Sequence, residues 1–148
     1  MERFKFVGTA HLILIKDGKI LLSRRFNTGW GDGKYSVVAG HLDGNETPLQ
    51  AMVREAKEEA DIKLKIKDLE IVHVMFRRSH DERIDFFVQT NKWEGEPHNT
   101  EPDKCDDMQW FYLDKLPDNT LPYIRQAIEM IRNKVFYSEH GWENVTQK

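Results

Sequence analysis

Residues 40–62 read GHLDGNETPLQAMVREAKEEADI, a loop with two glycines that leads into a helix. The helix has a clear start, because Thr47 can cap its first turn, Pro48 suits the first helical position and Gln50 completes a capping box. Apolar residues then recur at helical spacing, so we predict an amphipathic helix over residues 48–60. Its apolar stripe, which would pack against a sheet, consists of Leu49, Met52, Val53, Ala56 and Ala60.

The polar face of this helix carries Glu55, Glu58 and Glu59, at spacings of three and four residues that bring Glu55 beside both others. Like charges at these spacings destabilise a helix by about 0.2–0.5 kcal/mol per pair, and carboxylates near its C-terminus oppose the dipole at about 0.3–1 kcal/mol each. Arg54 and Lys57 offset only part of this cost. Such a face is commonly just solvated, but clustered carboxylates on a rigid element are also what Mg²⁺ needs, since it takes oxygen ligands and bridges to substrate phosphates.

The residues around the helix favour metal binding. Glu46 follows Gly40 after five intervening residues, and Arg54-Glu55 follows after seven more and leads to Glu58-Glu59. These positions resemble the Nudix box, Gly-x5-Glu-x7-Arg-Glu-U-x-Glu-Glu-x-Gly-U, where U is a bulky or aliphatic residue. Six fixed positions match at the right spacing, so the chain is similar to Nudix hydrolases over this stretch.

The chain departs from the pattern at two places. Asp61 stands where the family has a glycine after the helix, at a site that needs a left-handed backbone, which Asp tolerates better than most residues. We expect this departure to lower stability and not activity. Val38-Ala39 precedes Gly40 where many members have Pro-Gly, which leaves the path of the loop open but not the acidic cluster.

The resemblance implies a fold and a reaction. The fold is an α/β fold, the Nudix-type α/β/α sandwich with a mixed β-sheet. The reaction is magnesium-dependent attack of water on a phosphorus of a diphosphate linkage, in a nucleoside diphosphate joined to another group, with Mn²⁺ as an alternative metal. Positioning and charge neutralisation account for most of the catalysis of such a reaction.

Carried over by position, the residues of the box take specific roles. Glu55 is either a metal ligand or the base that takes a proton from water, while Arg54 orients and neutralises the carboxylates. Glu46 would support the loop by pairing with Arg54. The predicted catalytic residues are thus Glu55, Arg54 and Glu58. The predicted metal ligands are the Gly40 carbonyl oxygen, Glu55, Glu58, Glu59 and, from a later loop, Glu101.

Glu101 is a candidate because many family members use a further acid from a loop beyond the helix. Any such acid could equally be solvated, and the acids that compete with it are Glu82, Glu96 and Asp103.

Four residues outside the box are candidates for substrate binding. Arg24 and Arg25 end a predicted strand, where a guanidinium could bind a substrate phosphate in a bidentate way or simply be a surface arginine. Trp30 and Tyr35 could stack on a base, although aromatic residues near short strands more often belong to a core.

The rest of the chain alternates strands and turns. Asp17-Gly18 between two apolar runs predicts a hairpin turn of type I′. No repeat or linker divides the sequence, so we predict one Nudix domain over residues 1–148. The predicted elements outside the box are strands at 4–15, 20–24, 35–38, 63–77, 83–89 and 108–113, and a second helix from Pro122 to about Val135.

Composition sets outer limits on function. The 148 residues carry a net charge of −3 and no long basic run, which argues against a nucleic-acid-binding surface but leaves room for a small phosphorylated ligand. The single cysteine, Cys105, excludes an intramolecular disulfide and suits a reducing cytoplasm. The longest apolar stretch, Leu12–Ile15, is far below the roughly 20 residues of a membrane helix. We therefore expect a cytoplasmic protein without a membrane partner.

Other functions remain open at this stage. A non-catalytic Nudix-fold module that senses a nucleotide would be expected to lose the acids that are present here. A Nudix-fold isomerase acting on a prenyl diphosphate would want a catalytic cysteine in its site, which Cys105 in a polar region supports poorly. The resemblance is also compatible with a homodimer. The box specifies the diphosphate chemistry but not the nucleoside or the group joined to it.

Overall fold

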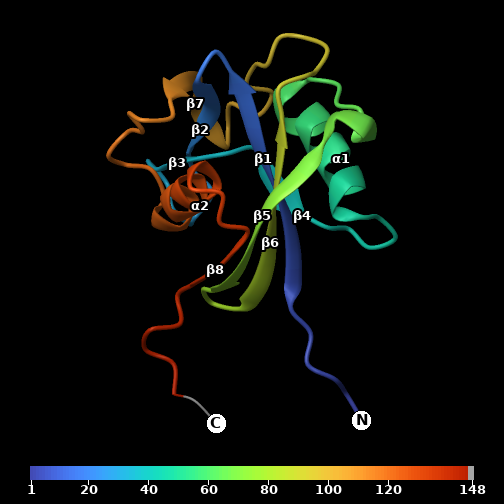
Figure 1. Cartoon of the computed structure of the whole chain (residues 1–148), viewed down its shortest axis with the longest axis vertical. Helices are drawn as coiled ribbons and strands as arrows, with labels where there is room; N and C mark the ends of the chain where they lie inside the picture. The colour runs from blue at the N-terminus through green and yellow to red at the C-terminus, as the bar shows by residue number, and fades with distance from the viewer. Residues whose placement is uncertain (147–148) are drawn as a thin grey trace.

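The computed structural model describes residues 1–146 and shows a mixed sheet with one helix on each face (Figure 1). The strand order is β3-β2-β1-β6-β5-β8, while β4 pairs with β1 and β7 pairs with β2. The predicted fold class, an α/β/α sandwich with a mixed sheet, is confirmed. The elements are β1 (Val7–Lys16), β2 (Lys19–Arg25), β3 (Tyr35–Ser36), β4 (Ala39–His41), α1 (Pro48–Ala60), a 3₁₀ turn (Ile66–Asp68), β5 (Glu70–Arg78), β6 (Glu82–Thr90), β7 (Cys105–Tyr112), α2 (Pro122–Arg132) and β8 (Tyr137–His140).

Strand β1 is the centre of the sheet. It runs parallel to β6 over residues 7–14, and its other side pairs with β4 near the start and with β2 only at its last two residues. The predicted turn of positive φ angles joins β1 to β2, with φ of 52° at Asp17 and 76° at Gly18. Because β2 pairs with β1 only at residues 15 and 16, β2 and β4 are not paired with each other along β1. The candidate site lies between these two strands.

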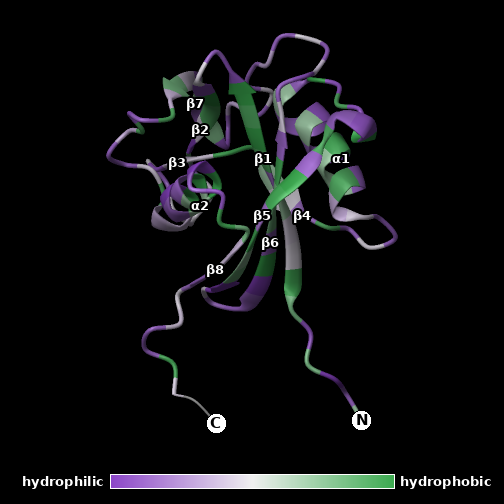
Figure 2. Ribbon diagram, viewed as in Figure 1, coloured by the Kyte–Doolittle hydropathy of each residue, from purple (hydrophilic) through white to green (hydrophobic). Residues whose placement is uncertain are grey.

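Alternation along β1 divides the core into two parts. Ala10 and Leu12 pack in the cluster that includes Met52 and Ala56 of α1, whereas Ile13 packs in the cluster that includes residues of α2. Figure 2 shows hydrophobic colouring along the central strands and hydrophilic colouring in many of the connecting loops. The sheet therefore holds α1 rigidly on one face, which fixes the position of its acidic residues.

Helix α1 begins and ends where the sequence predicts. The Thr47 hydroxyl accepts a hydrogen bond from the Gln50 amide at 3.1 Å, and the Gln50 side chain accepts one from the Thr47 amide at 2.9 Å, so the capping box is complete. At the other end Asp61 adopts the predicted left-handed conformation, with φ 53° and ψ 40°. Lys57 donates to the Asp61 carboxylate at 2.6 Å and adds a local partner at this cap.

Replacing Thr47 with alanine tests the cap. We expect Thr47→Ala to lower the free energy of unfolding by about 1 kcal/mol, because the Gln50 amide loses its acceptor. The midpoint of urea unfolding measures the loss. The Thr47→Ser variant keeps the hydroxyl and should unfold near the wild-type midpoint; equal behaviour of the two variants would show that the capping bond contributes nothing.

Several boundaries differ from the sequence-based expectation. Gly40 and His41, predicted as the start of a loop, belong with Ala39 to β4, which pairs with Thr9–His11. Helix α2 ends at Arg132 rather than near Val135, because Lys134 turns to a φ of 59°. The chain then forms β8, which is parallel to β5 and fastened to α2 by Gln126, whose side chain donates to the Ser138 hydroxyl and the Glu139 carbonyl. Among residues 1–146, no helix combines the length and apolar character needed to cross a membrane.

Candidate active site

The contact between α1 and β4 builds one wall of the site. Glu55 projects from α1 directly against Gly40, and a Cβ atom added at Gly40 would overlap its carboxyl group. Position 40, where the predicted loop begins, must therefore be glycine if Glu55 is to lie there. Burial raises the pKa of Glu55, and Arg54, which bonds to it, acts in the opposite direction.

Arg54 is the centre of an ion-pair network. Its Nη2 donates to the Glu46 carboxylate at 2.7 Å and to the His41 carbonyl at 3.1 Å, which ties the loop to the helix. Its Nη1 donates to Glu55 at 2.7 Å and to Glu58 at 3.3 Å. The hydrogen bond from Arg54 holds the pKa of Glu46 below its usual value. The pairing of Glu46 with Arg54 that the family resemblance implies is therefore present.

Glu59 is the acid of the helix that bonds to the β4 backbone, and its side chain is partly buried. The Ala39 amide donates to its carboxylate at 3.0 Å, and no cation of residues 1–146 lies within ion-pair distance of it. Burial, together with the negative charge of Glu55, raises the pKa of Glu59 to about 8. A carboxyl group in this position is costly to ionise unless a cation joins it.

A cavity of about 520 Å³ brings the predicted residues together. We call it the carboxylate cavity, because Glu55, Glu59 and Glu101 line it along with Gly40. Glu58 is exposed and does not line it. These donors are all oxygen atoms, as a hard divalent cation requires. Within residues 1–146 no three acidic, histidine or cysteine side chains converge around one point, since Arg54 draws Glu55 and Glu58 to itself.

Glu101 reaches this cavity because its loop is tied to the end of α1. The Thr100 hydroxyl donates to the Glu58 carbonyl at 2.6 Å, and the Glu101 amide donates to the Asn99 side chain at 3.0 Å. The competing acids Glu82, Glu96 and Asp103 do not line the carboxylate cavity. The geometry therefore favours Glu101 among the candidates outside the box.

Positive charge faces the acids from β2 and the loop after Glu101. Arg24 is held by Asp106 at 2.7 Å, whereas no carboxylate of residues 1–146 lies within ion-pair distance of Arg25. Arg24, Arg25 and Lys104 line the carboxylate cavity together with the glutamates. The structure thus separates the two predicted arginines into one with a protein partner and one that faces the cavity without a countercharge.

The two aromatic candidates, Trp30 and Tyr35, differ in whether they line a cavity. Trp30 is half-exposed and lines a second, adjoining cavity. Tyr35 is buried, packs edge-on against Phe111 and donates a hydrogen bond to Asp107. Its ring faces neither cavity, so the prediction that Tyr35 contacts the substrate is not supported by its position.

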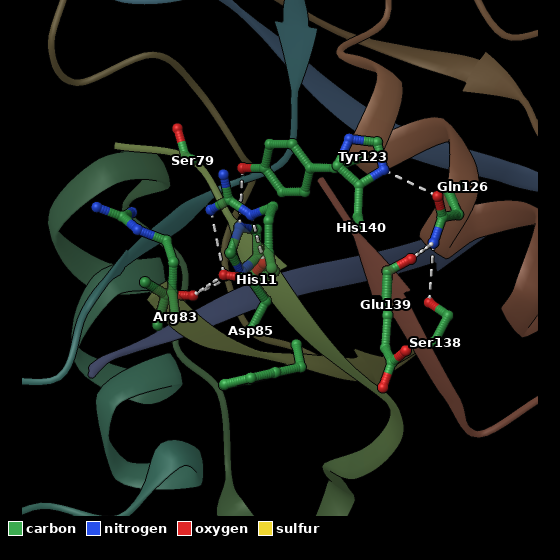
Figure 3. Close-up of polar contacts among 12 residues, drawn as sticks. His11, Ser79, Arg83, Asp85, Tyr123, Gln126, Ser138, Glu139 and His140 are labelled. Atoms are coloured by element: carbon green, nitrogen blue, oxygen red, sulfur yellow. Dashed lines mark hydrogen bonds and ion pairs between the residues drawn. The ribbon is translucent and has the colours of Figure 1, made fainter. Parts of the chain in front are cut away.

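Polar residues of the central strands form a network that sequence analysis did not identify (Figure 3). Arg77 and Asp85 form a buried ion pair at 2.6 Å, and Thr9 donates to Asp85 at 2.5 Å. His11 bonds to the Tyr123 hydroxyl at 3.1 Å, and burial lowers the pKa of His11 to about 4, so it is neutral at pH 7. Thr9 and His11 in β1, and Arg83 and Asp85 in β6, do alternate with apolar residues, but such alternation normally predicts a solvated face and so does not identify a buried network.

Substituting Gly40 tests the close approach of Glu55. We expect Gly40→Ala to lower turnover of any substrate by at least about 10-fold, since a displacement of roughly 1 Å in a positioned group can cost about 100-fold. Gly8→Ala is the matched control, because its Cβ would meet only the Leu42 side chain at an ordinary 3.5 Å. Steady-state kinetics of the two variants make the comparison, and equal turnover would contradict the placement of Glu55.

Comparison with known proteins agrees with this geometry. A family model described as NUDIX domain matches residues 5–132. The NAD-capped RNA hydrolase NudC of Chromobacterium violaceum is 27% identical over 137 residues, covering 86% of this chain and 48% of that protein. The chain therefore spans about half the length of the curated relatives it matches.

Solved structures give the same result. The MutT NUDIX hydrolase from Burkholderia pseudomallei superposes with a TM-score of 0.77 at 26% identity, covering 83% of this chain and 95% of that one. A bifunctional NMN adenylyltransferase/ADP ribose pyrophosphatase from Francisella tularensis, complexed with AMP and a Mn ion, superposes with a TM-score of 0.69 at 20% identity, covering 88% of this chain and 42% of that one. With a family model that matches most of its length, the chain belongs to the NUDIX domain family.

Proposed function

We propose that this protein is a divalent-cation-dependent pyrophosphohydrolase, which uses Mg²⁺ or Mn²⁺ to hydrolyse a diphosphate linkage in a nucleoside diphosphate joined to another group. The observation that carries the proposal is the carboxylate cavity, which is lined both by carboxylate oxygens and by Arg25 and Lys104, neither of which has a carboxylate of residues 1–146 within ion-pair distance. A metal-bridged diphosphate would neutralise both sides at once. The similar NAD-capped RNA hydrolase named above supports the same class of substrate.

Five residues of the cavity have a part in the proposed mechanism. Glu59 and Glu101 would hold the cation together with the Gly40 carbonyl, and a bound cation supplies polarisation of the phosphoryl oxygens and acidification of water. Glu55 is placed to accept the proton of the attacking water, and its raised pKa suits a base. Arg25 would bind a phosphoryl oxygen of the substrate.

Arg54 and Glu58 do not line the carboxylate cavity. Arg54 holds Glu55, Glu58 and Glu46 in place, so we assign it a positioning role rather than contact with the substrate. Glu58 would need to leave Arg54 to join the cation as a ligand.

The proposal is tested by phosphate release from a panel of nucleoside triphosphates, nucleotide sugars, dinucleotides, NAD and NAD-capped RNA, with a coupling phosphatase. We expect turnover of at least one compound with Mg²⁺ or Mn²⁺ and none with a chelator in excess. Binding of a panel compound without turnover would favour the alternative, a nucleotide-sensing module. The homodimer stays a prediction, which sedimentation would test separately.

A further inference from the structure

A second cavity of about 280 Å³ adjoins the carboxylate cavity and shares Gly40, Arg25 and Tyr123 with it. We call it the arginine cavity, because Arg25, Arg77 and Arg83 all line it. A substrate whose diphosphate lies in the carboxylate cavity can extend past Gly40 into this space. The arginine cavity is thus placed to contact the part of the substrate next to the diphosphate.

Two of these arginines are placed at a cost to stability. Arg77 of β5 and Arg83 of β6 are directly opposite each other in the antiparallel pair. Like charges in this relation destabilise a sheet. Each is neutralised by its own aspartate, Arg77 by Asp85 at 2.6 Å and Arg83 by Asp81 at 2.7 Å. A core of apolar residues would avoid the problem, so the arrangement points to a use for the guanidinium groups.

The three guanidinium groups are fixed in the same manner. Arg77 and Arg83 each use Nε and Nη2 to bind an aspartate, and Arg25 uses the same two atoms to bind the Trp30 carbonyl and the Thr28 hydroxyl. Within residues 1–146 the Nη1 atom of none of them has a hydrogen-bond partner. Arg77 is fixed further by the Tyr123 ring, whose centre lies 3.7 Å from its Cζ. The cavity therefore presents preorganised donors.

Acceptors are scarce on the same walls. No residue that lines the arginine cavity has a carboxylate or carboxamide side chain, while the side chains of Trp30 and the three arginines can only donate. The remaining polar side chains are hydroxyl and imidazole groups, which can act either way. Asp85 lies behind the wall, where it accepts from Thr9 and Arg77 (Figure 3). Burial alone would raise the pKa of Asp85, but His11 and Arg77 hold it below its usual value, so it remains an acceptor only.

Trp30 adds a flat apolar surface to these donors. It is half-exposed at the edge of the cavity, and the Arg25 guanidinium lies 5.3 Å from the centre of its ring. A planar group can stack on such a ring while its edge faces the guanidinium groups. An edge of carbonyl oxygens would find partners there, whereas an exocyclic amino group would face donors.

We propose that the arginine cavity takes the nucleobase of the substrate, with Arg77 and Arg83 as the specificity-determining residues. It selects bases with an oxo group at purine C6 or pyrimidine C4, such as hypoxanthine and uracil, over adenine and cytosine, which carry an amino group there. The inference rests on the proposed function for the position of the diphosphate. The expected preference for the oxo group depends only on the hydrogen-bond donors among the side chains that line the arginine cavity.

Two matched pairs of nucleotides test this selectivity, because ITP and ATP, like UTP and CTP, differ chiefly in one oxo or amino group. We expect the oxo member of each pair to bind about 10-fold tighter or more, on the scale of one good contact to a base edge. Titration calorimetry with Ca²⁺ in place of Mg²⁺ measures binding without needing turnover. Steady-state kinetics with Mg²⁺ should show the same order in kcat/KM.

The variant Arg83→Met removes one set of donors, and Arg78→Met is its control, since Arg78 lies next to Arg77 but lines neither cavity. We expect the preference to fall several-fold in Arg83→Met and to persist in Arg78→Met. Equal binding within both pairs, or an unchanged preference in Arg83→Met, would overturn the inference. Loss of pyrophosphate binding in Arg83→Met with no base preference would show an anion site instead and would overturn it too. Selective binding without turnover would leave the inference intact and reject the proposed hydrolase.

Discussion

The Glu59→Gln variant is expected to lose at least about 100-fold in kcat/KM with magnesium, on the scale of removing one electrostatic partner from the transition state. Glutamine keeps the size of the side chain, and its oxygen can still accept from the Ala39 amide. What it loses is the charge that a divalent cation requires. Kinetics over a range of magnesium concentrations measure the loss, and more metal should recover only part of it.

Stability provides the control for this variant. Glu59 is partly buried, and burial together with the charge of Glu55 raises its pKa to about 8, which makes ionisation unfavourable without a cation. Glu59→Gln should therefore unfold at the wild-type temperature or above it in the absence of metal. Glu129→Gln, on the exposed face of α2, should change neither property. Full activity of Glu59→Gln would contradict the assignment of Glu59 as a metal ligand.

The Asp85→Ala variant is expected to lower the free energy of unfolding by about 3–5 kcal/mol, the usual cost of leaving one member of a buried ion pair without its partner. Asp85 is 0% exposed and Arg77 is 4% exposed, so water cannot replace the lost carboxylate. Thr9 also loses its acceptor. Urea unfolding followed by circular dichroism measures the change.

Asp81→Ala is the matched control for Asp85→Ala. Asp81 forms the same kind of bidentate pair with Arg83, but its side chain is 32% exposed at the hairpin between β5 and β6. An exposed pair of this kind contributes at most about 1 kcal/mol. A loss in Asp85→Ala as small as that in Asp81→Ala would show that the buried pair does not stabilise the sheet.

Local signals in the sequence predicted the elements that depend on local interactions. The capping box of Thr47 and the positive φ of Asp61 fixed the ends of α1, and Asp17-Gly18 fixed the first hairpin. Strand β4 was missed because it exists only through pairing with β1, whose partner residues lie about 30 positions earlier. Strand β8 depends in the same way on β5, so nothing in its own residues identifies it.

The roles of the site residues stay predictions, but the structure does bring several of these residues together. Glu55, Glu59, Gly40, Glu101 and Arg25 all line one cavity. Periodicity could not reveal that the polar face of β1 and β6 is turned inward. Alternating polar residues normally indicate a solvated face, and only the covering α2 and Tyr123 make them buried.

The parallel pairing of β1 with β6 has a consequence for how the chain acquires its fold. Thr9 and Asp85 are 76 residues apart, so joining these strands closes a long loop whose entropy must be lost before the contact stabilises anything. Topologies of this kind fold in milliseconds to seconds, more slowly than helical bundles. Helix α1 forms from residues inside that loop, but the walls that complete the arginine cavity come from both of its ends. During synthesis, the arginine cavity cannot form until β6 has left the ribosome. Until then β1 lacks its parallel partner strand, and its apolar side chains are exposed to chaperones.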